Sequence, residues 1–273
     1  MSRISSCHYL MIRVFQCEES LTGILTGVYD AWGSRLGHAN VRLIAGIENP
    51  QLFCEYEDVS PDVEKAGKVM RTIKNRMGED TFRMIAQAAA ATEPERADVI
   101  YRTIVLGLHL PDGRRAVEML SQPEIMKLFS LSRKAGNLAA RYIEFLRFRE
   151  LQNGILLGEM DPEGDVLDLV ASHFSDRFPL ENWMIYDHRR RKMAVHPSGK
   201  VWYVVEEVEE KTISELKESE LETKFSDLWK CFFETIAIEA RKNAKLQNQL
   251  APLKYRAYMT EYKNNEGLHF CKK

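Results

Sequence analysis

The pattern of apolar residues changes twice along this chain, near residue 58 and near residue 148, and that change restricts the possible folds more than any other feature. Helix start signals recur between the two points, whereas short apolar runs rich in strand formers lie before and after them. We therefore expect an α+β protein: a small α/β subdomain over 1–58, a helical region over 59–147 and an α+β region over 148–273.

The first region begins with a predicted strand over 9–15, and Ser20 is the expected N-cap of a helix with apolar residues at helical spacing up to Trp32. The apolar pieces 41–47 and 52–56 are candidate strands beside the first. The sequence thus predicts a strand followed by a helix, with further strands in the same sheet.

The helical region contains residues that signal where helices begin and end. Ser60, followed by Pro61, begins a helix that Gly78 ends. Thr92 with Glu95, and Ser121 with Glu124, fit the capping box. The expected helices are 61–77, 80–91, 94–110 and 122 to about 147.

The last region is expected to form a small antiparallel sheet followed by a long C-terminal helix. Its predicted strands are 155–157, 183–186, 193–195 and 201–205, and a helix over about 166–174 interrupts them. The long helix is predicted over about 221–249. Its apolar face, which we expect to pack in the core, consists of Phe225, Leu228, Trp229, Phe232, Ile236 and Ala240.

Composition and sequence motifs limit the classes of ligand site that this chain can contain. The 38 Lys and Arg against 40 Asp and Glu exclude a uniformly basic surface, so any site for a polyanion is a local patch. The five cysteines are scattered without a CxxC pair, and GxGxxG, GxxxxGK[ST], HExxH and GxSxG are absent. We expect no cofactor and no metal.

No run approaches about 20 apolar residues, so we expect a cytoplasmic protein with no membrane contact.

One candidate nucleic-acid surface lies on the helix predicted from residue 122. Lys127, Lys134 and Arg141 are seven residues apart, nearly in line over about 21 Å, and Arg147 and Arg149 continue the series. Such a line can follow a phosphate backbone. The alternative is a solvated helix face.

A second basic stretch lies near the C-terminus. Cations, amides and tyrosines alternate there, which suits phosphates, base edges and stacked bases. Equally, these cations can offset a helix dipole while Tyr255 and Tyr258 pack the tail down. The candidate residues are Arg241, Asn243, Lys245, Gln247 and Arg256.

Polar residues near 173–192 allow a different interpretation. His173 could transfer protons, Asp187 could orient water and Arg177 could hold phosphate, if folding brought them together. Spacing alone does not do so, and a helix-end histidine and a solvated hairpin explain the same residues. These weak catalytic candidates leave open whether the chain is an enzyme.

Several segments, taken in order, resemble a bacterial family assigned to DNA metabolism or repair. They read LTGILTGVYDA at 21–31, FLRFRE at 145–150, HFSDRF at 173–178, NWMIYD at 182–187 and LWKCFF at 228–233, with Ile236, Ala237, Ile238, Arg241, Asn243, Gln247 and Pro252 after them. Members of that family are typically encoded beside a radical SAM protein bearing helix-hairpin-helix elements. A similar region is fused to uracil-DNA-glycosylase domains in other proteins.

The resemblance implies a role in DNA metabolism, with DNA and a radical SAM helix-hairpin-helix protein as partners. It supplies no catalytic residue, and the cluster and S-adenosylmethionine belong to the neighbouring protein. The expected function is a nucleic-acid-binding partner of a radical SAM enzyme. An enzyme acting directly on DNA or a nucleotide, and a protein-binding adaptor, are the alternatives.

Overall fold

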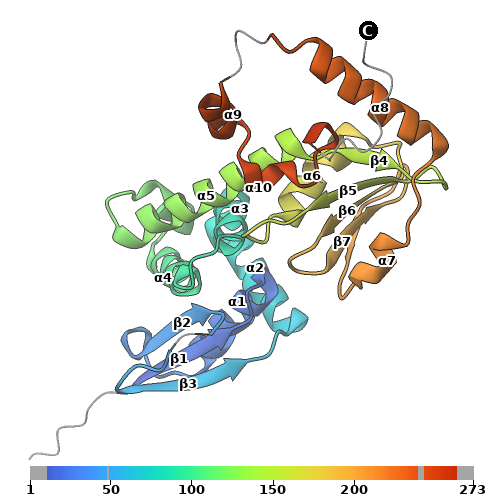
Figure 1. Cartoon of the computed structure of the whole chain (residues 1–273). Coiled ribbons are helices and arrows are strands. Elements are labelled where there is room, and N and C mark those ends of the chain that lie inside the picture. Colours follow the sequence, from blue (N-terminus) through green and yellow to red (C-terminus); the bar gives the residue numbers. More distant parts are fainter. Residues whose placement is uncertain (1–10, 48, 239–242, 263–273) are drawn as a thin grey trace, which may run out of the picture. The chain divides into compact units, whose positions relative to one another are not determined.

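The computed structural model describes residues 11–47, 49–238 and 243–262 (Figure 1). Helices and strands occur in both halves, which confirms the predicted α+β class. The chain divides into two compact units, residues 1–137 and residues 138–273. Each unit has its own sheet. None of the described helices is both long enough and apolar enough to span a membrane.

The first unit is built on a parallel sheet whose central strand, β1 (Ile12–Cys17), pairs with β2 (Val41–Ala45) and with β3 (Cys54–Val59). A parallel pair needs a crossover, and α1 (Leu21–Gly33) lies in the connection from β1 to β2. Ser20 caps α1 as predicted, because its hydroxyl oxygen accepts a hydrogen bond from the third residue of the helix.

The predicted helices of the middle region are present within a few residues of their expected ends. They are α2 (Val63–Met77), α3 (Glu79–Ala89), α4 (Arg96–His109) and α5 (Pro123–Phe145). Short 3-10 turns occupy His38–Asn40 and Gly113–Glu118.

The helix ends show which of the predicted capping residues were correct. Gly78 ends α2 with a φ of 89°, a value that favours glycine, and its N–H bonds back to carbonyls of the last turn. Asp62, not Ser60, caps the start of α2 through two backbone N–H groups. The capping box predicted at Thr92 is wrong: Glu95 is the N-cap residue of α4, it is helical, and no side chain caps it.

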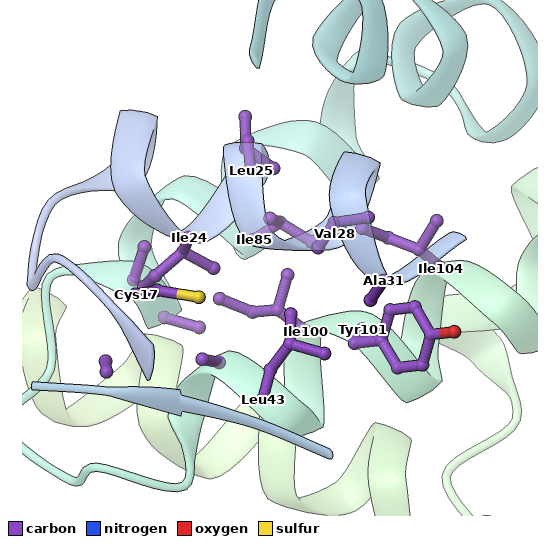
Figure 2. Close-up of a cluster of buried hydrophobic side chains, with 14 of the residues drawn as sticks. Cys17, Ile24, Leu25, Val28, Ala31, Leu43, Ile85, Ile100, Tyr101 and Ile104 are labelled. Atoms are coloured by element: carbon purple, nitrogen blue, oxygen red, sulfur yellow. The ribbon is translucent and has the colours of Figure 1, made fainter. Parts of the chain in front are cut away.

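The core of the first unit lies between one face of α1, the sheet and the later helices (Figure 2). Ile24 and Val28 of α1 meet Leu43 of β2 and Ile100 of α4, all at most 2% exposed. Cys17 is buried in the same cluster, and burial raises the pKa of its thiol to about 12. This cysteine is therefore a packing residue.

The second unit holds a five-stranded sheet in the order β4-β5-β6-β7-β8. The strands are β4 (Phe148–Glu150), β5 (Leu156–Met160), β6 (Trp183–Asp187), β7 (Lys192–His196) and β8 (Tyr203–Val205). The expected all-antiparallel order is wrong for one pair. β5 and β6 are parallel. The connection between them contains α6 (Leu167–Arg177), which returns the chain to the end of the sheet at which β5 began.

The C-terminal helix is shorter than expected. After α7 (Glu210–Ser214), α8 covers Glu220–Thr235, and a separate helix, α9, covers Ala244–Leu250. Asn243 begins α9, its side chain accepting a hydrogen bond from the N–H of Leu246, and asparagine favours such a cap over a helix interior. The short helix α10 (Leu253–Arg256) and a 3-10 turn at Thr260–Tyr262 follow.

Candidate nucleic-acid interface

The three cations predicted to line up on α5 are exposed, and each is ion-paired within the chain. Lys127 lies 3.1 Å from a carboxylate oxygen of Glu95, and Arg141 lies 3.1 Å from Glu144. Lys134 pairs with Glu93. Exposed ion pairs are weak, so a phosphate group can still displace these carboxylates. The charge offered to a nucleic acid is nevertheless smaller than the sequence suggested.

Arg147 and Arg149 are also ion-paired. The Arg147 guanidinium lies 2.8 Å from Glu261. The Arg149 guanidinium lies 2.8 Å from Glu159 and 2.9 Å from Glu218. Both arginines are half-buried, so their first role is to join strands and helices of the second unit.

Residues 243–262 bring several candidates together. Arg256 donates to the carbonyls of Ala251 and Gln247 and to the side chain of Asn248, and its guanidinium lies 4.6 Å from the Tyr262 ring centroid. Gln247 donates to the Tyr262 hydroxyl at 3.2 Å. These groups are committed to internal contacts.

Of the remaining candidates, Asn243 is the cap of α9 and Lys245 is exposed on that helix. Arg177 is exposed at the end of α6, with its guanidinium 5.8 Å from the Phe178 ring centroid. Arg241 lies outside the described residues. Lys127 and Lys134 belong to the first unit and the other described candidates to the second.

The tyrosines of the C-terminal segment pack rather than face outward. Tyr255 is buried, with ring centroids of Tyr142 and Phe145 each 5.1 Å away. Tyr258 is half-buried and stacks on His188 at 4.9 Å. Neither ring is free to stack on a base, which favours the interpretation that both hold the segment in place.

The weak catalytic candidates do not form an acid-base pair. Asp187 is fully buried and accepts hydrogen bonds from the backbone N–H groups of Arg189 and Arg190, so it caps the hairpin between β6 and β7. Burial raises the pKa of Asp187, and the nearby Arg190 opposes that rise. His173 is exposed on α6, and within the described ranges no hydrogen bond or ion pair joins it to Asp187.

The sequence analysis did not single out His188, the residue that follows Asp187. Its Nε2 lies 3.1 Å from Glu159, its Nδ1 lies 3.5 Å from Glu210, and Tyr258 covers its ring. The hydrogen bond to Glu159 raises the pKa of His188, burial opposes that rise, and Glu210 adds to it. Its position just after a strand with buried residues was the available signal. The basic residues after it suggested a solvated turn instead.

The apolar face of α8 is exposed, contrary to the expectation that it packs in the core. Phe225 is 63% exposed and Phe232 is 53% exposed, and α8 has no buried residue. Trp229 is exposed as well, and Ala240 lies outside the described residues. The other large exposed apolar residues of this stretch recur at helical spacing; they are Leu221, Phe225, Leu228, Phe232 and Ile236. We call these five residues the α8 apolar face. Periodicity predicted an apolar face correctly but could not predict what covers it.

A cavity of about 480 Å³ lies beside this face, lined by Arg147, Phe148, Phe225, Trp229 and their neighbours. Trp229 is 43% exposed, and its indole N–H points to Glu261 at 3.4 Å. Within the part of the chain that the structure describes, no group of three or more His, Cys, Asp or Glu side chains is placed to hold a metal.

Comparisons with known proteins add one assignment. No curated protein matches this chain. A solved structure described as a member of the s1p family of ribosomal proteins, with a DHH domain, is 10% identical. That match covers 69% of this chain and 74% of the other, and its TM-score of 0.33 is too low to support an argument about fold or function. Residues 94–261, more than half of the chain, match the domain of unknown function DUF4130. The chain therefore belongs to the DUF4130 family.

Proposed function

We propose that this chain is an accessory protein of DNA metabolism, acting in repair as a nucleic-acid-binding partner of a radical SAM enzyme. The family resemblance supplies the class of process and the partner. The fusion of a similar region to uracil-DNA-glycosylase domains fits a module that works beside an enzyme carried by another domain or chain.

The observation that carries the partner role is the α8 apolar face. Four of its residues lie on successive turns of α8 and the fifth, Ile236, is the C-cap residue, with spacings of three and four residues. Isolated exposed apolar residues are ordinary, but a continuous apolar stripe is typical of a protein-interaction site. A helix of a partner protein can pack against such a stripe through the partner's own apolar face.

Polar residues in the first half of α8 contact the rest of the second unit. Glu222 accepts hydrogen bonds from the backbone N–H of Glu150 and from the Ser226 hydroxyl, and all three residues are half-buried. The helix is thus held through polar contacts while its apolar side is exposed. Exposure of these apolar side chains to water is unfavourable, and a partner that covers them accounts for their presence on the surface.

The test is co-purification of the full chain with the radical SAM helix-hairpin-helix protein encoded beside family members. Phe225→Asp and Leu228→Asp place a charge in the proposed contact, whereas Thr223→Asp adds the same charge to the same helix outside the apolar face. We expect the first two variants to lose the complex and the third to keep it.

Retention of the complex by Phe225→Asp and Leu228→Asp would remove α8 from the interface. A failure of the unmodified chain to form any complex with that protein, with and without DNA, would contradict the proposed partnership itself.

A further inference from the structure

A cleft of about 340 Å³ lies on the first unit between α1, α2 and α4. Its floor is formed by the buried side chains of Val28, Ile73 and Ile104. Tyr29 and Trp32 of α1 form its exposed aromatic wall, at 38% and 41% exposure. The volume is at the lower end of the range for small-molecule sites, and an apolar floor with few polar groups is typical of them.

One residue of the aromatic wall, Trp32, packs against a histidine that is held in a polar network. The Trp32 and His38 ring centroids are 4.7 Å apart, and His38 Nδ1 lies 2.8 Å from the hydroxyl of the buried Tyr101. Arg102 donates to the backbone carbonyls of His38 and Val41. A Trp32 ring held in this way loses little conformational entropy when a ligand binds against it.

The charge beside the cleft is positive. Lys68 lines the cleft with its Nζ 5.7 Å from the Tyr29 ring centroid, and Arg71 is exposed on the next turn of α2. Across the described residues, neither cation has a carboxylate within ion-pair distance, whereas Lys65 on the same helix pairs with Asp30 at 2.7 Å. Lys68 and Arg71 thus differ from the three α5 cations predicted to line up, each of which is paired in the chain.

An aromatic wall beside unpaired cations fits a ligand that is planar at one end and anionic at the other. We propose that this cleft binds a nucleobase carrying a phosphate, with the base against Trp32 and Tyr29 and the phosphate at Lys68. Arg71 does not line the cleft and adds positive charge on the next turn of α2. The choice of nucleic acid as the source rests on the proposed function. Because duplex bases are stacked and inaccessible, the ligand is a single strand, an extruded nucleotide or a free nucleotide.

The test measures binding of a labelled short oligothymidylate to the full chain by fluorescence anisotropy. Trp32→Ala removes the stacking surface and is expected to weaken binding about tenfold, while Trp32→Phe keeps most of the affinity. Lys68→Glu with Arg71→Glu is expected to weaken binding and to reduce the salt slope by about 0.7 for each phosphate that the variant no longer neutralises.

Two variants serve as matched controls. Phe129→Ala removes an exposed aromatic ring from α5, and Arg83→Glu reverses an exposed cation on α3. Neither residue lines the cleft. Both variants are expected to bind the oligomer as the unmodified chain does.

A second arm measures binding of thymidine monophosphate by calorimetry. Tighter binding of the oligomer assigns the cleft to a strand, and equal binding assigns it to a free nucleotide; both support the site. Oligomer binding that Trp32→Ala and the double variant leave unchanged, equal losses in the controls, or no binding of either ligand would overturn it. The chain is tested here without a partner, so failure of this test is distinguishable from failure to bind the radical SAM protein.

Discussion

At the scale of single residues, His188 has two carboxylate neighbours, whereas His173, the histidine that the sequence analysis singled out, is exposed on α6. His188 lies between Glu159 and Glu210 and beneath the Tyr258 ring, so it ties the C-terminal segment to the sheet. The short apolar runs at 183–186 and 193–195 predict the hairpin that carries it. A distant segment covers that hairpin, and local sequence holds no information about such a contact.

This arrangement predicts a pH-dependent stability. Because the folded pKa of His188 is raised, its contribution is fully present below the unfolded value of about 6.5 and is lost as pH rises through the folded value. His188→Gln should therefore lower the melting temperature more near pH 6 than near pH 8.5. His173→Gln, at an exposed histidine, is the control. A loss for His188→Gln that is equal at both pH values would show that the charge of His188 contributes nothing.

A second prediction concerns the acids that neutralise α5. Glu93→Gln together with Glu95→Gln frees Lys134 and Lys127 from their ion pairs. If the α5 cations bind duplex DNA, the double variant should bind it more tightly at low salt, with a salt slope steeper by up to about 0.9 for each additional phosphate that is neutralised. Glu79→Gln, which frees Lys74 on α2, is the control. Unchanged duplex affinity in the double variant would exclude the α5 cations from the interface.

At the scale of elements, the sequence predicted most helices and strands because their signals are local. Ser20 and Gly78 act within one turn of the residues they cap. The parallel pairing of β5 with β6 depends on how distant segments meet. The exposure of the α8 apolar face also depends on contacts with other parts of the molecule. The sequence predicts the helical spacing of its apolar residues, but it does not predict whether they are buried.

The packing of α10 on α5 gives a stability prediction that separates two aromatic residues. Tyr255→Ala removes a buried ring that packs on Tyr142 and Phe145 and should cost about 3 kcal/mol or more. Trp229→Ala should cost clearly less, because that ring is 43% exposed. Urea unfolding of both variants measures the difference. An equal loss of stability would mean that Trp229 is part of the core.

At the scale of the whole molecule, the DUF4130 match begins at residue 94 and so leaves out the parallel sheet, α1, α2 and α3. Most of the residues that line the cleft therefore lie before the matched region, whereas the α8 apolar face lies within it. The two proposed surfaces thus belong to different parts of the chain.

The most direct test of the accessory role is product formation from damaged DNA, measured with this chain alone, with the radical SAM protein alone and with both together. The account predicts no product from this chain alone, and more product from the two proteins together than from the radical SAM protein alone. Phe225→Asp should abolish that increase. Processing of damaged DNA by this chain with no partner present would contradict the account and would make the chain itself the enzyme.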